Sequence, residues 1–345
     1  MRALRFSRLA SQYLDTIGRM RTSAIIDCDP GHDDVMAILL AARTLDLRGI
    51  TTVHGNTTLV NTTLNARKTV EFADIRHIPI AAGMARPLVR EEHNAPEVHG
   101  KTGLDGPTLP DPTVKILDQH AVDFIIERSH DIPDLHLIPV GPLTNIAAAL
   151  VKDRTLPSRI KQISLMGGSL TFGNVTPAAE FNIWCDPEAA HVVFTSGIPI
   201  KMIGLNVTNQ VIATTPRRKQ IRELGRSTGK MTPIHVADML DFYAHGEGQY
   251  SGLDGGAMHD PLAVTALVAP DILTFAPMRV DVELNGTHTY GMTLSDGRRL
   301  DPSTNLPRPG VKPREDGGAV NAEVAVAVDV DKFWDLFLEV LATYP

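Results

Sequence analysis

Hydrophobic and polar positions alternate in blocks along the first two hundred residues. Short apolar runs predict six strands, at Ala24–Ile26, Gly49–Val53, Ile78–Ala81, Leu135–Val140, Gln162–Met166 and Pro199–Leu205. Their continuous hydrophobicity is typical of strands that are buried on both faces. Helical runs lie between or after them, at Val35–Leu45, Leu59–Ala73, Ile116–His130, Asn145–Val151 and Pro187–Thr195. The repetition of strand and helix predicts right-handed crossovers and hence a parallel sheet.

The second half of the chain has a different pattern. Residues 206–258 are predicted to be largely helical, and a tight turn at Asn285–Gly286 is predicted to join two alternating strands. These strands, a later strand and a closing helix are expected at Met278–Leu284, Thr287–Leu294, Ala322–Val328 and Asp331–Thr343. We therefore expect an α/β fold: an open, mostly parallel sheet with Rossmann-like order, helices on both faces, and extra C-terminal antiparallel strands and helices. No linker divides the apolar runs, so residues 23–345 are predicted to form a single domain.

The composition is typical of a globular protein, with 43% hydrophobic and 21% charged residues. The net charge of −7 argues against nucleic-acid binding. No apolar run approaches the ~18 residues that a membrane span needs, so we expect no membrane partner and a cytoplasmic location. Two cysteines, Cys28 and Cys185, do not make a disulfide framework. The arginine-rich residues 1–22 are interpreted as an N-terminal extension or a short surface helix, with an organellar transit segment as the alternative.

Four carboxylates lie within eight residues at the end of the first predicted strand, at Asp27, Asp29, Asp33 and Asp34. Acids in the first turn of a helix would explain Asp33 and Asp34. First-turn acids do not explain Asp27 and Asp29. In addition, four clustered negative charges repel one another in a low-dielectric site. Carboxylate oxygens are the ligands that Ca²⁺ and Mg²⁺ prefer, so this segment predicts a metal site.

Further polar groups follow the other predicted strands, at His54–Asn56, Gly141–Asn145, Gly167–Gly168 and Asn206. Because open α/β sheets bind ligands at the carboxyl ends of their strands, one cleft is expected to collect these groups.

Two more segments carry candidate chemistry. In an extended chain Glu180 and Asn182 would share a face and, with Asn174, could bind a polyol; the alternative is an Asn-rich turn with a surface Glu. His259 and Asp260 stand at a loop-to-helix junction, where Asp260 could complete the ion's shell and His259 could reach a leaving group, although a lone histidine is more often structural.

Together these motifs resemble the nucleoside hydrolase family, of the inosine–uridine-preferring type. The block Asp27–Asp34 is similar to that family's amino-terminal signature. Gly141–Asn145, Asn174–Asn182 and His259–Pro261 match in order and spacing, and the resemblance runs from about Ser23 to the C-terminus.

The resemblance implies a role for each candidate residue. Asp29 would be the general base, and His259 would assist departure of the nucleobase. The ligands of a Ca²⁺ ion would be Asp29, Asp34, Asp260 and the main-chain carbonyl of Val140. The ribose hydroxyls would be held by Asp33, Asn56, Asn174, Glu180 and Asn182. The rest of the pocket would be lined by Met166 beside the ribose, His99 near the nucleobase, and Tyr250. Asn206 departs from the pattern, because the family commonly has Asp there.

The implied reaction is hydrolysis of the N-glycosidic bond of a small ribonucleoside to ribose and free base. A calcium-bound water activated by Asp29 would attack the sugar. The resemblance also implies a homodimer or homotetramer. One alternative is a haloacid-dehalogenase-like, Mg²⁺-dependent phosphatase, which also has an Asp-x-Asp pair after its first strand but expects Thr where Gly31 stands. The other is a non-catalytic nucleoside- or ribose-binding protein. The preferred base depends on residues 91–106 and 242–258 and is not predicted.

Overall fold

The computed structural model describes residues 21–345 apart from 253, 302, 305, 307 and 309–317, and for 247–251 it describes the backbone only. All but two residues of the predicted N-terminal extension therefore lie outside the described part.

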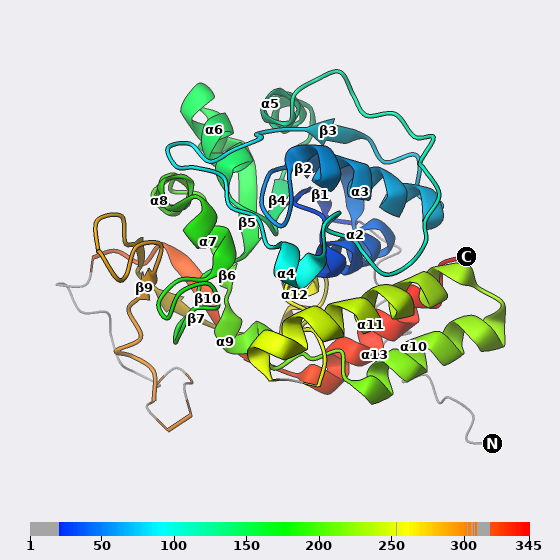
Figure 1. Ribbon diagram of the computed structural model, residues 1–345. Coiled ribbons are helices and arrows are strands. Elements are labelled where there is room, and N and C mark those ends of the chain that lie inside the picture. Colours follow the sequence, from blue (N-terminus) through cyan, green and yellow to red (C-terminus); the bar gives the residue numbers. More distant parts are fainter. Residues whose placement is uncertain (1–20, 253, 302, 305, 307, 309–317) are drawn as a thin grey trace.

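The centre of the molecule is an eight-stranded sheet with the order β3-β2-β1-β4-β5-β6-β10-β7 (Figure 1). In that order the strands are Ile80–Ala82, Asp46–Thr52, Ser23–Cys28, Leu135–Pro139, Ile160–Met166, Ile200–Ile203, Ala322–Val328 and Leu273–Met278. All neighbours are parallel except β10 and β7, which are antiparallel. The first six strands have the Rossmann order, with its switch point between β1 and β4. The predicted fold class is thus confirmed.

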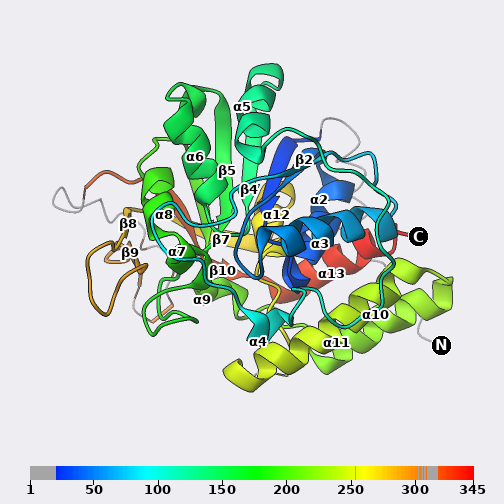
Figure 2. The same ribbon diagram turned by 45° about the horizontal axis from the view of Figure 1, so that its top comes forward.

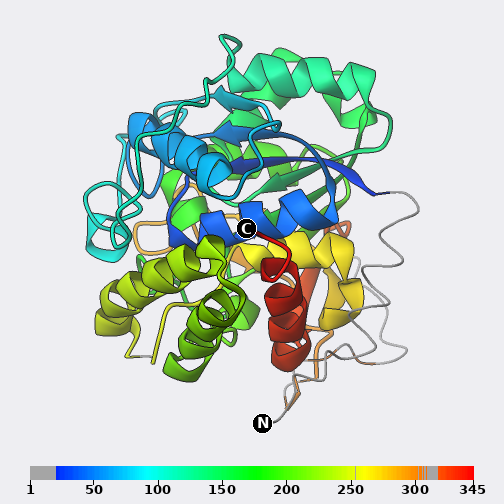
Figure 3. The ribbon, with the colours of Figure 1, turned by 90° about the vertical axis from the view of Figure 1, so that its right-hand side faces the viewer.

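Helices cover both faces of this sheet (Figures 2 and 3). One face carries α2 (His32–Thr44), α3 (Leu59–Phe72), α12 (Pro261–Val268) and α13 (Val330–Leu341), with α10 (Thr215–Thr228) and α11 (Met231–Ser251) outside them. The other carries α5 (Ala121–Asp131), α6 (Thr144–Lys152) and α8 (Pro187–Phe194). The short elements are α4 (Pro96–His99), α7 (Phe181–Cys185), α9 (Leu205–Thr208), η1 (Leu156–Ser158), η2 (Pro270–Ile272), β8 (Val280–Val282) and β9 (Thr293–Ser295).

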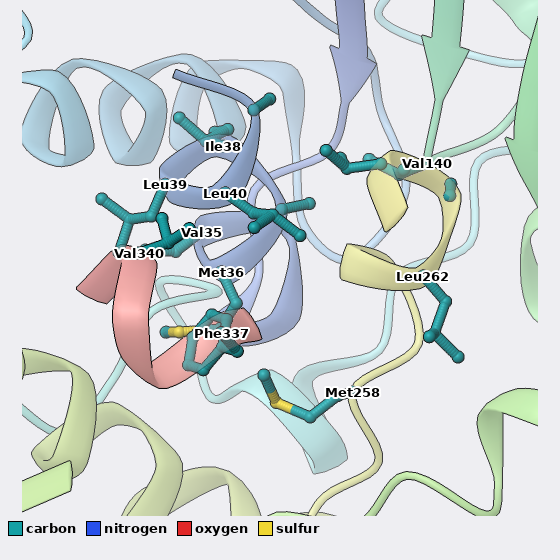
Figure 4. Packing of buried hydrophobic residues seen from close by; sticks show 14 of the residues in the cluster. Val35, Met36, Ile38, Leu39, Leu40, Val140, Met258, Leu262, Phe337 and Val340 are labelled. Carbon is teal, nitrogen blue, oxygen red and sulfur yellow. The ribbon is translucent and has the colours of Figure 1, made fainter. Parts of the chain in front are cut away.

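Two hydrophobic clusters flank the sheet, and β1 contributes to both. Ile26 points into one cluster and its neighbour Ile25 into the other, which explains why the run Ala24–Ile26 in this strand is apolar. In the first cluster Phe337 and Val340 of α13 lie beside Val35 and Met36 of α2 (Figure 4). Both clusters pack on the same sheet, and the assignment of residues 23–345 to one domain stays a prediction.

The tight hairpin turn predicted at Asn285–Gly286 is wrong. The strands that pair are β8 and β9, with Val282 opposite Thr293, so a longer segment connects them. The amides of Asn285 and Gly286 instead bind the carboxylate of Glu283, at 2.7 and 2.9 Å, which closes a different local turn. Neither residue has the positive φ that a two-residue type I′ turn requires.

Other predicted elements hold with shifted ends. The helix expected at 116–130 begins only at Ala121, where His120 accepts a hydrogen bond from the Val122 amide and caps it. Both cysteines are buried free thiols. Within the described residues, each helix is too short or too polar to cross a bilayer.

We predict that Phe337→Ala destabilises the protein by about 3–5 kcal/mol, because it removes a side chain that is 1% exposed and leaves a cavity between α13 and α2. The shift of the urea unfolding midpoint measures this. Val60→Ala, at a site 78% exposed, is the control and should change stability by about 0.5 kcal/mol at most. Equal effects of the two substitutions would contradict the packing described for α13.

Candidate functional site

The turns that follow β1, β2, β4 and β5 meet at a cavity of about 740 Å³, a size suited to a small ligand. The predicted site residues that line it are Asp33, Asn56, His99, Val140, Met166, Asn174, Glu180, Asn182, His259 and Asp260. Asp29 and Asp34 are fully buried and hydrogen-bonded to Asn56 at its edge. The structure therefore brings together residues that are as much as 231 positions apart (29 to 260) in the chain.

The acidic turn between β1 and α2 is closed by Asp34. Its two carboxylate oxygens accept hydrogen bonds from the amides of Asp29 and Gly31, each at 3.0 Å. Asp34 also stands in the first turn of α2, where the helix dipole favours negative charge. Glycine is needed at position 31, because a Cβ there would collide with the imidazole ring of His99 and the side-chain amide of Asn56.

Asp29 is held on one side only. Its Oδ2 accepts a hydrogen bond from the Asn56 amide at 2.7 Å, while Oδ1 is buried and has no hydrogen-bond partner among the described residues. A Cβ on Gly55 or Gly141 would overlap this carboxylate, so the two glycines enclose it closely. An enclosed carboxylate oxygen without a donor is a position where a cation or a water molecule would be stabilised.

Three further acids converge beside Asp29. Carboxylate oxygens of Asp33, Asp34 and Asp260 lie within 4.8 Å of one another, and all three residues are buried. Burial first, and then the neighbouring acids, raise the pKa of Asp29 and of Asp260 well above the usual range, and burial raises the pKa of Asp34. A hard divalent cation would offset this repulsion and takes six to eight oxygens when it is Ca²⁺, so the residues present fit such an ion.

Asp33, predicted to hold the sugar, lies beside the predicted ligands Asp34 and Asp260. Asp29 adjoins this group, because its amide binds Asp34. The fourth predicted ligand, the Val140 carbonyl, accepts a hydrogen bond from Asn182 Nδ2 at 3.0 Å in this structure. Of the predicted ligands, Val140 and Asp260 line the cavity, and Asp29 and Asp34 are joined to it through Asn56.

Asp27 serves a different purpose from the other acids of its cluster. Its Oδ1 accepts hydrogen bonds from Thr51 Oγ1 at 2.6 Å and Asn145 Nδ2 at 2.7 Å, which tie β1 to β2 and α6. Burial raises its pKa to about 7. The hydrogen bonds of Asp27 therefore hold β1, β2 and α6 together next to the site.

Glu180 and Asn182 sit on a helix start and not on the extended segment that the sequence suggested. Glu180 caps α7 and accepts hydrogen bonds from the amides of Asn182, Ile183 and Gly168 at 2.8–3.1 Å. It is 3% exposed, so the alternative of a surface Glu is wrong. Asn174 accepts a hydrogen bond from the Phe181 amide at 2.9 Å, which places its carboxamide at the same cavity wall.

His259 lies directly before α12, next to Asp260. Its Nδ1 is 2.7 Å from Thr208 Oγ1 of α9, which fixes the orientation of the ring. The imidazole lines the cavity and is therefore within reach of a bound ligand.

Part of the cavity wall is built from rings. Tyr243 of α11 lies 5.4 Å from both His32 and His99, with all three rings within 18° of parallel. Burial lowers the pKa of His32 to about 4 and that of His99 well below its usual value. Sequence reasoning missed Tyr243 as an individual residue, although it continues the buried helical positions Val236 and Leu240.

Two expectations have mixed outcomes. Tyr250 falls in α11, but its side chain lies outside the described residues. Asn206 donates to the Ala325 carbonyl at 2.9 Å and accepts from the Leu170 amide at 3.4 Å, so it links β10 to the loop after β5. Phe172, Val98 and Asn209 also line the cavity, and no local motif had indicated them.

Known proteins match this chain over most of its length. The sequence model of the inosine-uridine preferring nucleoside hydrolase family matches residues 24–335. The pyrimidine-specific ribonucleoside hydrolase RihB of Shigella flexneri is 38% identical over 323 residues, 93% of this chain and 97% of the relative. A purine-preferring ribonucleoside hydrolase from Gardnerella vaginalis is 33% identical with a TM-score of 0.83, over 93% of this chain and 98% of that one. The plant nucleoside hydrolase PpNRh1 is 35% identical with a TM-score of 0.81, over 93% and 99%.

We predict opposite effects of Asp260→Asn with and without metal. In a chelator the variant should melt at a higher temperature than the parent, because a buried charge that repels its neighbours is gone. With CaCl₂ at about 100 times the dissociation constant, the parent should gain about 2.7 kcal/mol and the variant much less. Thermal melts of both proteins and of the exposed control Asp111→Asn would show this; equal gains for all three would exclude a metal at this cluster.

Proposed function

The chain belongs to the inosine-uridine preferring nucleoside hydrolase family and is an N-ribosyl hydrolase; from this premise we propose that its buried aspartates hold Ca²⁺ and that Asp29 is the general base. The observation that carries the proposal is the buried, half-partnered Asp29 carboxylate beside the convergent oxygens of Asp33, Asp34 and Asp260. The products are ribose and a free base.

Asp29, Asp34, Asp260 and the Val140 carbonyl would hold the ion. When bound, Ca²⁺ supplies positive charge that keeps these acids ionised, lowers the pKa of adjacent water and attracts sugar hydroxyls. The role of Asp29 itself is to accept a proton from the attacking water, since its Oδ1 has no donor among the described residues.

The sugar is held by carboxylates, which accept hydrogen bonds, and by carboxamides, which both donate and accept. We assign its hydroxyls to Asp33, Asn56, Asn174, Glu180 and Asn182, which all line the cavity. Glu180 and Asn182 are fixed by contacts to main-chain groups, so they are ordered before substrate arrives. Met166 supports the ribose from its apolar side. The transition state carries positive charge on the sugar, which a surrounding of carboxylates favours.

The nucleobase leaves toward the ring-lined wall. His259 would assist its departure by donating a proton or a hydrogen bond, with Thr208 holding the imidazole in place. His99 lies near the base and contributes to its binding.

The two alternative functions have less support. A phosphatase of the haloacid-dehalogenase type does not explain membership of this family or the clamp at Glu180 and Asn182. A non-catalytic ribose-binding protein would not need a buried, half-partnered carboxylate at the sugar site. The named relatives include pyrimidine-specific and purine-preferring enzymes, so the test of function covers both kinds of base.

We predict that reducing sugar is released from at least one of uridine, cytidine, inosine and adenosine, and that a chelator stops its release. Asp29→Asn should lower kcat by about 10²–10⁴-fold, because it removes the general base. Asp27→Asn is the matched control, because Asp27 is as deeply buried as Asp29 but does not line the cavity. This variant should keep kcat near the parent value. Undiminished turnover by Asp29→Asn would reject the assignment of the base.

We predict that His259→Ala slows hydrolysis of nucleosides but spares p-nitrophenyl riboside, whose leaving group needs no proton. Measurement of kcat on both substrates separates leaving-group assistance from sugar binding. His77→Ala, at an exposed position, serves as control. If His259→Ala lost equal activity on both substrates, His259 would not be the group that assists the base.

A further inference from the structure

His54 and Thr144 have no part in the mechanism above, although both stand where a parallel strand ends. His54 follows β2, and Thr144 follows β4 as the first residue of α6. Both side chains are fully buried, and neither belongs to the cavity wall. His54 Nε2 lies 3.0 Å from Thr144 Oγ1, so a hydrogen bond joins the turn of residues 54–56 to the turn of residues 141–144.

These two turns are the ones that enclose Asp29. The Asn56 amide donates to Asp29 Oδ2 at 2.7 Å, and a Cβ on Gly55 would overlap the same oxygen. A Cβ on Gly141 would instead overlap Oδ1. The Cβ on Gly55 would also lie 2.9 Å from Pro142 Cδ, so the two turns are in contact. Each turn therefore borders one oxygen of the carboxylate, and their separation sets the space that Asp29 has.

Asp186 determines which way the protons point. Its Oδ2 accepts hydrogen bonds from Thr144 Oγ1 at 2.7 Å and from the Leu88 amide at 2.9 Å, and its Oδ1 accepts from the Ala189 amide at 3.0 Å. A threonine hydroxyl has one hydrogen, which is here directed at the carboxylate. Thr144 Oγ1 can then only accept from His54, so His54 Nε2 carries the proton of their hydrogen bond.

The imidazole of His54 is neutral at neutral pH, because burial lowers its pKa to about 4. With the proton on Nε2, its Nδ1 is unprotonated and has no hydrogen-bond partner among the described residues. The donors and acceptors thus form one consistent series, from imidazole N–H to hydroxyl to carboxylate. In the described part of the chain, no other hydrogen bond joins residues 54–56 directly to residues 141–144.

We propose that His54 and Thr144 are positioning residues: their hydrogen bond keeps the two turns closed on Asp29, so that its Oδ1 stays directed at the attacking water. The inference rests on the proposed function for the role of Asp29. The sugar is held largely by groups on other elements, among them Glu180 and Asn182 at the start of α7. Loss of the hydrogen bond should therefore lower kcat more than it raises KM.

The first test removes the hydroxyl and then restores it. Thr144→Val keeps the shape of the side chain, and at saturating CaCl₂ it should lower kcat about 10- to 100-fold, because small displacements of a reacting group are costly. KM for the best nucleoside should change by about threefold at most. Thr144→Ser, which keeps the hydroxyl, should return kcat to within about threefold of the parent. Parental kcat in Thr144→Val would overturn the proposal.

A double variant separates positioning from loss of stability. In Thr144→Val the His54 N–H loses its acceptor and Asp186 loses a donor, so this variant should melt at a lower temperature than the parent. The double variant His54→Leu/Thr144→Val also removes the N–H that lacks an acceptor, and it should recover part of this loss. Its kcat should nevertheless stay as low as that of Thr144→Val, because the hydrogen bond is still missing. A kcat that recovers together with the melting temperature would reject the positioning role.

Thr51→Val is the matched control. Thr51 is fully buried and its hydroxyl donates to Asp27 Oδ1 at 2.6 Å, so the substitution removes the same kind of hydrogen bond outside the two turns. It should lower the melting temperature but leave kcat near the parental value. An equal loss of kcat in Thr51→Val would show that loosening of the sheet alone accounts for the effect, which would also overturn the proposal.

Crystal structures test the geometry without any assay of activity. In Thr144→Val the turns at Gly55 and Gly141 should lie further apart than in the parent protein, with the Asp29 carboxylate displaced. An Asp29 carboxylate that has not moved would contradict the proposal. If the parent protein releases no ribose from any nucleoside, the proposed function fails instead, and the two structures still decide whether the hydrogen bond holds the turns.

Discussion

The confinement of several carboxylates in one dry pocket is the constraint on which this structure depends. Asp29, Asp34 and Asp260 have at most 3% of their surface exposed; burial first, and then neighbouring acids, raise the pKa of Asp29 and Asp260, and burial raises that of Asp34. Main-chain amides and the start of α2 compensate part of the charge on Asp34, but no hydrogen-bond donor among the described residues reaches Asp29 Oδ1. The folded protein therefore keeps negative charge that is not compensated and that a cation can neutralise. Neutral hydrogen-bonding side chains surround this charge.

The sheet topology delivers these groups to one place. Because the strand order reverses between β1 and β4, the turns after both strands diverge and leave a crevice. Helix α12 then brings Asp260 against the turn of β1, and α11 brings Tyr243 against the loop of His99. Asp27 keeps β1, β2 and α6 in register below the crevice. Asp27 and Asp29 are two residues apart and would share a face in a regular strand; their contacts differ because β1 ends at Cys28 and Asp29 belongs to the turn that follows.

The regular core of the fold and most of the cavity wall could be predicted from the sequence. Buried parallel strands are apolar throughout, and their carboxyl ends are marked by Asp, Asn and Gly, so the meeting of Asp29, Asn56 and Val140 follows from topology. Three features could not be read in this way. The Asn285–Gly286 turn depends on the nearby Glu283 carboxylate, the backbone at Glu180 depends on its own capping bonds, and the rings beside His99 come from a helix whose docking no local pattern specifies.

The two glycines that enclose Asp29 limit how this position can evolve. Gly55 and Gly141 leave no space for even a methyl group next to the carboxylate, so one additional methylene at position 29 would push against main chain on both sides. A glutamate there could not be accommodated by a rotamer change, and both loops would have to be rebuilt before the substitution became viable. The same close contacts keep the carboxylate in one position, so a change of side-chain length is restricted more strongly here than a change of charge.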